Sequence, residues 1–209
     1  RYSEFLMASS PPGRLLSLDA FRGATIAAML FVNNHALWAV PPPPIPEQFR
    51  HRLWHGCTLT DLIFPFFLFI VGVAMPFSDA KRRAAGESFR EGWGHALRRA
   101  VAIFALGMFL QSVARGTPVF DLEVLQRIAV CYLAAFTVLR APPATQAAAA
   151  AGLFAGYLLF MLAVRAPGIP WDLRWDRGCT LAEHLDTRYL PFRQPNNEGL
   201  VSTLPAIAS

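Results

Sequence analysis

Long apolar stretches alternate with short polar segments along most of the chain. Four stretches contain no Asp, Glu, Lys or Arg: residues 23–46, 62–78, 100–114 and 141–164. A membrane-spanning helix needs about 20 mostly apolar residues. The first and last stretches reach this length alone, the second is marginal, and the third reaches it only with its flanking residues. A fifth candidate, residues 122–139, is interrupted by Arg127.

This pattern predicts an all-α fold, a polytopic integral membrane helical bundle with about five complete transmembrane helices plus the start of a sixth. The final residues, 200–209, read as the first turns of that sixth helix. The five complete spans are expected near residues 18–40, 59–78, 96–114, 122–140 and 147–165. A soluble helical protein with a large apolar core is the alternative.

The overall composition supports a membrane protein. Apolar residues make up 54% of the chain and charged residues 16%, whereas charged residues are about a quarter of a typical soluble domain. The lipid bilayer is therefore the expected partner of the helices. The net charge of +5 comes without an interleaving of basic and aromatic residues outside the apolar stretches, so no nucleic-acid partner is expected.

The distribution of basic residues predicts the orientation of the chain. The loop between the second and third spans carries the densest basic cluster: Lys81, Arg82, Arg83, Arg90, Arg98 and Arg99. Cytoplasmic loops are enriched in Lys and Arg. This loop and the N-terminus are therefore expected in the cytoplasm, and the loops at residues 41–58 and 166–200 on the outer side.

A polar segment with two histidines leads directly into the second span. Residues 49–76 read FRHRLWHGCTLTDLIFPFFLFIVGVAMP, with His51 and His55 within ten residues of Asp61. An ionisable residue at the edge of a span suggests a functional site, because hydrocarbon does not tolerate an idle charge. Histidine is the side chain best suited to proton transfer near neutral pH. The segment therefore predicts chemistry at a membrane face.

Helix geometry places several other polar residues at the same depth. Asn33 lies in the outer half of the first span when that span begins at the inner face, at about 1.5 Å of rise per residue. Asp61, Arg127 and Glu198 each stand near the outer start of a later span. Together with His51, these residues are expected to share one layer although they are scattered along the sequence.

Each member of this layer also has a purely structural interpretation. Asn33 can hydrogen-bond across helices, and Asp61 can cap the second span, because an acid is favourable at a helix N-terminus. Arg127 would pair with Asp61 or Glu198, since an unpaired charge is costly in the membrane. The histidines of the first outer loop, His35 among them, can be ordinary solvated side chains.

The remaining unusual residues add little chemistry. Trp38 and Trp54 fit an interfacial aromatic belt better than a sugar-stacking platform. Cys57 and Cys179 fall in outer loops, where a disulfide is allowed. No cysteine pair has the C-x-x-C spacing of a metal site, and no metal is expected.

Five motifs occur in order along the chain: SLDAFRG at 17–23, VNN at 32–34, WHGCTLTDLIFPFFLFIVG at 54–72, VLQRIAVCYL at 124–133 and NEGLVSTLPAI at 197–207. Together they resemble the heparan-α-glucosaminide N-acetyltransferase family, including its bacterial relatives. The W-x-G-x-T-x-x-D-L-x-F-P block, with LQR downstream, is the specific part. The opening LD-x-x-RG motif is also similar to the start of the wider membrane acyltransferase superfamily.

This resemblance implies a polytopic acetyltransferase. Members of the family take an acetyl group from cytosolic acetyl-CoA, the co-substrate, and deliver it to an amino sugar of the glucosamine type on the far side of the membrane. Residues 1–209 would form a single membrane domain, the N-terminal part of a larger acyltransferase domain. For a bacterial relative the expected location is the inner membrane, with the N-terminus in the cytoplasm, and a homodimer is one assembly it allows.

The resemblance also implies roles for single residues. By position, His51 matches the catalytic histidine, Asn33 the asparagine that ends the first span, and Asp61 the acid that opens the second. Arg127 and Glu198 match polar positions with a supporting role.

Two neighbours of His51 are further supporting candidates, Trp54 and His55. His55 stands where eukaryotic members carry Asn, so the chain holds a second candidate base. Residues 196–198, Asn-Asn-Glu, replace the usual Asp-Pro-Glu, which puts in doubt any role for the acid Glu198.

These residues suit attack of an amine on a thioester. His51 would act as the base, Asp61 would fix its tautomer, and Asn33 would donate to the developing oxyanion. Direct transfer and an acetyl-histidine intermediate both remain open. A transporter that uses Asp61 and Arg127 as a gating or proton-relay pair, and an O-acyltransferase with His35 as base, are the alternatives.

Overall fold

The computed structural model describes residues 15–34, 46–52, 54–118, 120–189 and 199–208, and every regular element in them is a helix. This confirms the predicted all-α fold for the described residues. In chain order the elements are α2 (Leu16–Asn33), η2 (Glu47–Phe49), η3 (Thr60–Leu62), α3 (Ile63–Ala84), α4 (Phe89–Arg115), α5 (Val124–Val138), α6 (Pro143–Ala163), η4 (Trp171–Leu173), α7 (Leu181–Tyr189) and α8 (Leu200–Ala208). The chain divides into two compact units, residues 1–81 and 82–209.

Three helices are long and apolar enough to cross a membrane: Thr60–Ala84, Phe89–Arg115 and Pro143–Ala163. They correspond to the second, third and fifth predicted spans. The predicted fourth span is the shorter helix α5, which has 15 residues. The predicted first span corresponds to α2 only as far as Asn33, and residues 35–40 lie outside the described part. The expected count of five spans is therefore not confirmed.

In the first unit, aromatic rings join α2 to the segments that follow it. The ring of Phe21 lies 5.4 Å from that of Phe66 and 6.2 Å from that of Phe69, between centroids. Near the end of α2, Phe31 contacts Phe49 of η2 at 5.2 Å. Edge-on ring pairs at these distances add to the burial of apolar surface. They connect α2 both to the start of α3 and to the loop that precedes it.

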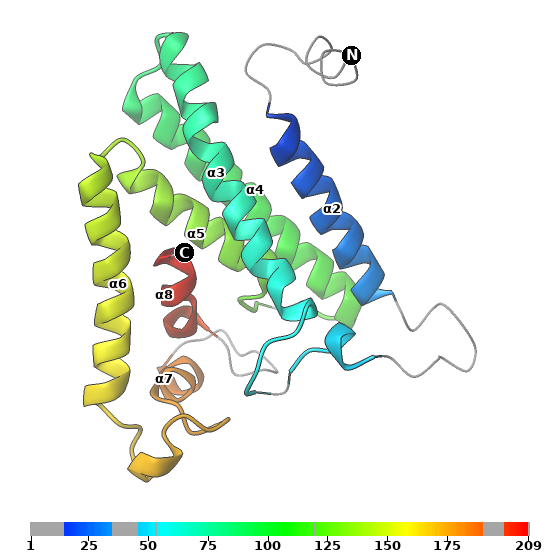
Figure 1. Ribbon diagram of the computed structural model, residues 1–209, viewed down its shortest axis with the longest axis vertical. Coiled ribbons are helices and arrows are strands. Elements are labelled where there is room, and N and C mark those ends of the chain that lie inside the picture. The colour runs from blue at the N-terminus through cyan, green and yellow to red at the C-terminus, as the bar shows by residue number, and fades with distance from the viewer. Residues whose placement is uncertain (1–14, 35–45, 53, 119, 190–198, 209) are drawn as a thin grey trace. The chain divides into compact units, whose positions relative to one another are not determined.

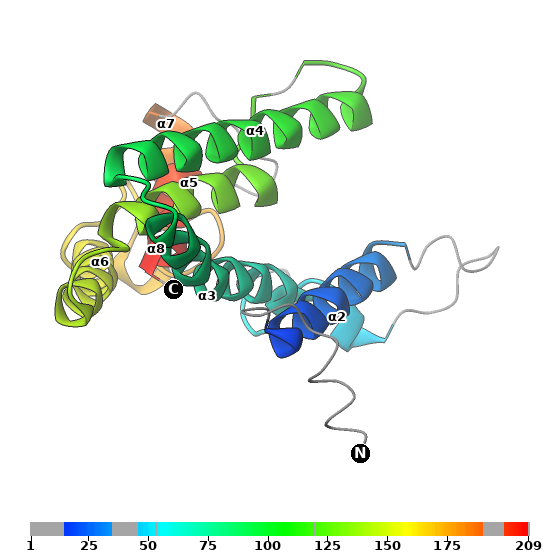
Figure 2. The same ribbon diagram turned by 90° about the horizontal axis from the view of Figure 1, so that it is seen from above.

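In the second unit, α4 and α5 pack closely as an antiparallel pair (Figures 1 and 2). Phe89 at the start of α4 stacks on Phe136 near the end of α5, with 5.9 Å between ring centroids. Gly107 permits the close approach further along. A Cβ atom there would stand 2.7 Å from the Gln126 side-chain oxygen and 2.9 Å from the Cβ of Leu125.

The C-terminal part of the second unit is built around the end of α6. Met161, Ala166, Leu181 and Ala182 form a buried apolar cluster there. Asp186 of α7, which is 1% exposed, accepts a hydrogen bond from the Val201 backbone N–H at 2.8 Å. The carboxylate therefore caps the N-terminus of α8.

Most apolar side chains of the candidate spans point outward. Only 6% of the most apolar window of α6 is buried, and 17% and 22% in the other two. Exposed side chains on α6 include Phe154, Leu158, Leu159 and Phe160. A water-soluble protein rarely exposes an apolar surface of this extent. These faces suit hydrocarbon, and the alternative of a large apolar core does not describe this structure.

Candidate functional site

His51 and Asp61 form a contact pair in the loop that leads into α3. The Nδ1 atom of His51 lies 2.8 Å from the Oδ1 atom of Asp61. The two residues are ten positions apart, and the loop between η2 and η3 turns back to bring them together. The structure thus places the predicted base beside the acid predicted to orient it.

This contact determines which nitrogen of His51 carries the proton. An ionised carboxylate only accepts hydrogen bonds, so Nδ1–H of the imidazole must be the donor to Asp61. In the neutral ring, Nε2 is then unprotonated and can accept a proton. The His51 side chain is 71% exposed and that of Asp61 is 26% exposed. Nε2 is therefore available to a substrate that approaches this loop.

The second carboxylate oxygen of Asp61 is held by its own turn. Oδ2 accepts hydrogen bonds from the backbone N–H and the hydroxyl of Thr58, each at 2.9 Å. The Arg52 backbone N–H lies 3.4 Å from the same oxygen. Asp61 therefore supports the start of the Thr60–Ala84 helix through one oxygen and His51 through the other. The structure supports a local structural role for Asp61, and its catalytic role stays a prediction.

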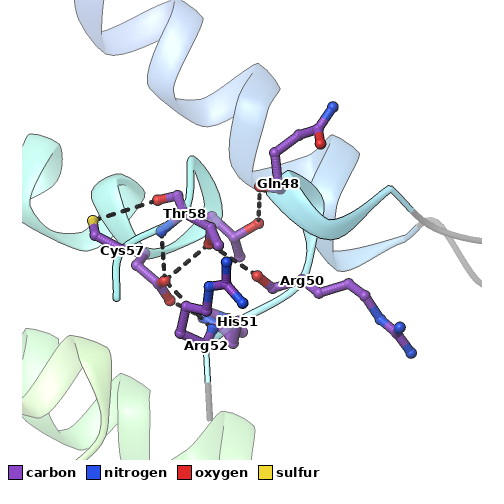
Figure 3. A network of polar contacts seen from close by, with 8 residues as sticks. Gln48, Arg50, His51, Arg52, Cys57 and Thr58 are labelled. Carbon is purple, nitrogen blue, oxygen red and sulfur yellow. Dashed lines mark hydrogen bonds and ion pairs between the residues drawn. The ribbon is translucent and has the colours of Figure 1, made fainter. Parts of the chain in front are cut away.

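Thr58 connects this carboxylate to the backbone beside His51. Its hydroxyl oxygen also lies 2.9 Å from the carbonyl oxygen of Arg50, as Figure 3 shows. Thr58 is 8% exposed, so water does not readily replace its contacts. Thr58 is not among the predicted site residues, although its T-x-x-D spacing from Asp61 was the available signal.

The rest of the loop is held by Arg52. Its guanidinium forms an ion pair with Glu47 of η2. Its side chain also covers Gly56, where a Cβ atom would lie 3.3 Å from the Arg52 Nε atom. Gly56 has a φ of 104°, a conformation that favours glycine. These contacts fix the turn that carries Trp54 and His55, both of them exposed.

The other predicted site residues are not brought to this pair by any described contact. Asn33 is the exposed last residue of α2, and its side chain has no hydrogen bond to another described residue. Glu198 and His35 lie outside the described residues. Arg127 belongs to the second unit, so its predicted pairing with Asp61 or Glu198 stays a prediction.

The second unit contains polar groups that are not among the predicted site residues. At the turn between α4 and α5, Arg115 forms ion pairs with Asp121 and, at 3.1 Å, with Glu123. Within the same helix pair, the amide groups of Gln111 and Gln126 are buried and have no hydrogen-bond partner among the described residues. In the LQR motif, Arg127 is the predicted site residue. Gln126 is the more buried of the two side chains and is 1% exposed.

No group of three or more His, Cys, Asp or Glu is arranged to hold a metal ion within the described part of the chain. The donors of the candidate site are one imidazole and one carboxylate, whose oxygens are already engaged with His51 and Thr58. This set suits proton transfer.

Comparison with known proteins gives one consistent result. The family described as "Heparan-alpha-glucosaminide N-acetyltransferase, catalytic" matches residues 14–175. The human heparan-alpha-glucosaminide N-acetyltransferase is 41% identical over 66 residues, which cover 31% of this chain and 9% of the human protein. The mouse protein of the same name is 30% identical over 131 residues, which cover 59% of this chain and 19% of the mouse protein. This chain therefore spans only a small part of the relatives' length.

Proposed function

Because the chain belongs to the heparan-alpha-glucosaminide N-acetyltransferase family, we propose that it forms part of a membrane enzyme that transfers an acetyl group from acetyl-CoA to an amino sugar. The family and the apolar helices support a membrane acyltransferase. The observation that carries the finer proposal is the 2.8 Å contact between His51 Nδ1 and Asp61 Oδ1. It leaves His51 Nε2 as an exposed base beside the first turn of a span.

In the proposed reaction, the amine of the sugar attacks the thioester carbonyl of the donor. His51 Nε2 takes a proton from the amine as the new C–N bond forms. Collapse of the tetrahedral intermediate breaks the C–S bond, and the proton on His51 passes to the leaving thiolate. The products are the N-acetylated sugar and free CoA, and the imidazole returns to its starting state.

Asp61 has two roles in this scheme. Its Oδ1 atom holds the His51 ring in the tautomer that exposes a basic Nε2. Its negative charge also stabilises the imidazolium that forms during the reaction. Asn33 is proposed to donate to the oxyanion, and Arg127 and Glu198 to support the site. Trp54 and His55 are proposed to line the acceptor side.

The proposed topology follows from charge and from the site itself. The basic segment 81–99, which contains the end of α3 and the start of α4, is proposed to face the cytoplasm, with the N-terminus. His51 would then face the outer side, where the glucosamine-type acceptor binds, while acetyl-CoA enters from the cytoplasm. A donor and an acceptor on opposite faces require a path through the membrane, and helices that enclose polar groups can line one.

The decisive experiment is acetyl transfer to glucosamine by the purified full-length protein in nanodiscs, with acetyl-CoA as donor and normalisation to folded protein. His51→Ala should lose at least about 10²-fold in turnover, the usual loss when a general base is removed. His55→Ala is the matched control from the same exposed loop and should cost much less. Normal turnover in His51→Ala, with loss in His35→Ala or His55→Ala, would assign the base to the other histidine.

A second variant tests the orienting acid. Asp61→Asn removes the charge beside His51 but keeps a carbonyl oxygen that can accept from Thr58. The turnover number should fall while the KM for acetyl-CoA stays near the wild-type value, because Asp61 acts through His51 and is not proposed to contact the donor. If the wild-type protein carries a sugar across the bilayer without acetylating it, the transporter interpretation replaces the enzyme.

A further inference from the structure

Two tryptophans and an arginine form a cluster just after the end of α6. The Arg174 guanidinium carbon lies 5.0 Å from the ring centroid of Trp171 and 5.7 Å from that of Trp175. Both distances are within the range of cation–π attraction, about 6 Å. Trp171 is 43% and Trp175 39% exposed. These three residues, called the Trp–Arg platform below, belong to the segment between α6 and α7, which Figure 1 shows as a turn.

The platform has a fixed place relative to α6. Ala166 lies in the buried cluster with Met161 of α6 and Leu181 of α7, and Ile169 packs against the same cluster. The segment between the helices is therefore anchored on both sides, and η4 begins two residues after Ile169. The platform is held close to the C-terminal end of α6 and follows the last apolar turn of that helix.

The surface that leads to the platform suits lipid. The window of α6 is 6% buried, and large apolar side chains are exposed along its second half: Leu153, Phe154, Leu158, Leu159, Phe160 and Leu162. When this surface lies in hydrocarbon, the platform reaches the level where the helix leaves the membrane. Tryptophan is enriched at that level, because its ring is apolar and its N–H needs a polar partner.

The charge at this level indicates what the platform binds. Residues 165–177 contain three basic side chains, Arg165, Arg174 and Arg177, and two acidic ones, Asp172 and Asp176. Basic groups are therefore in excess. A guanidinium presents a planar fork of donors that matches a phosphate group, and it stacks on aromatic rings at the same time.

We propose that the Trp–Arg platform is a membrane-interface anchor that binds the phosphate headgroup of a lipid in the leaflet at the C-terminal end of α6. The two indole rings lie among the lipid ester groups, and Arg174 donates to the phosphate. This contact sets the depth of the turn that leads into α7. It is independent of the acetyl transfer proposed above.

The position of the platform is tested by fluorescence of the full-length protein in nanodiscs, in a variant whose only tryptophans are Trp171 and Trp175. Lipids brominated near the ester groups should quench this emission more strongly than lipids brominated near the chain ends and more strongly than aqueous iodide. Dominant quenching by iodide would place the rings in water and overturn the proposal.

The role of Arg174 is tested by native mass spectrometry of the protein with bound phosphatidylglycerol. Arg174→Gln should lower the retention of this lipid about fivefold, the factor that corresponds to one basic side chain at an anionic surface. Arg174→Lys keeps the charge without the planar fork, so its lipid retention should lie between that of the wild type and that of Arg174→Gln. Arg177→Gln is the matched control from the same turn and should have a smaller effect.

Two outcomes would contradict the assignment. Equal retention in Arg174→Gln and Arg177→Gln would reduce the platform to a general basic surface. Displacement of the lipid by inorganic phosphate at matched concentration would indicate a site for soluble anions, and not for the membrane.

Discussion

Replacement of Thr58 by valine is the sharpest test of how the His51–Asp61 pair is held. Valine keeps the shape of the side chain and the backbone N–H that donates to Asp61, but it removes the hydroxyl. That hydroxyl lies 2.9 Å from Asp61 Oδ2 and 2.9 Å from the Arg50 carbonyl oxygen. A hydroxyl has one hydrogen, so it donates to one of these two acceptors at a time.

The size of the effect follows from these contacts. A hydrogen bond to a charged group contributes about 1.5–3 kcal/mol. Asp61 is 26% exposed, so water replaces part of the lost contact, and about 1–2 kcal/mol remains. If this loss is expressed fully in the transition state, turnover falls about 5- to 30-fold. The loss is smaller than that of His51→Ala, because the base itself is still present.

The assay is the same acetylation of glucosamine by the full-length protein, with kcat and KM measured separately. Thr58→Val should lower kcat and leave the KM for acetyl-CoA unchanged, and Thr58→Ser should restore most of the turnover. Thr60→Val is the matched control: Thr60 is buried too, but its hydroxyl makes only a 3.5 Å contact with the Gln48 carbonyl. Equal losses in Thr58→Val and Thr60→Val would show that loop packing, and not the link to Asp61, is responsible.

Two further predictions address the helices. In a thermal unfolding assay, Gly107→Ala should destabilise the protein by about 1–3 kcal/mol, a typical cost of overpacking, because the new Cβ would lie 2.7 Å from the Gln126 side-chain oxygen. Gly94 is the control, because the position of its Cβ has open space around it. Gly94→Ala should be neutral or stabilising in the same assay. An impermeant thiol reagent should label a single cysteine at Glu47 and spare one at Ala85 in intact cells, and the reverse pattern would invert the proposed topology.

Much of the helical organisation could be predicted from apolar runs, but helix ends could not. α4 begins at Phe89, seven residues before the predicted span at 96, because Ser88 and Glu91 form a capping box that starts the helix in a polar segment. α5 has 15 residues and so extends only about 22 Å at 1.5 Å per residue. That is shorter than a hydrocarbon core of about 30 Å. The apolar run at residues 122–139 did not reveal that the helix is this short.

Two residues of the candidate site, Asp61 and His51, could be predicted from the sequence because of their chemistry. Asp61 stands out because a carboxylate at the start of an apolar run is rare and costly, and His51 because histidine transfers protons near neutral pH. Thr58 carries a weaker signal, the T-x-x-D spacing that it forms with Asp61. Its hydroxyl oxygen also lies 2.9 Å from the carbonyl oxygen of Arg50, eight residues earlier, and sequence patterns do not reveal such contacts.

The site lies where a span begins because that position satisfies opposing requirements. Within hydrocarbon, irregular backbone and an exposed charge are both excluded. One turn before α3, the chain can form the loop that carries His51 and still use the helix N-terminus, which favours the Asp61 carboxylate. The buried Thr58 hydroxyl completes the hydrogen bonding of this carboxylate. A displacement of Asp61 by one helical turn into α3 would bury the charge and separate it from His51, so the pair depends on this position.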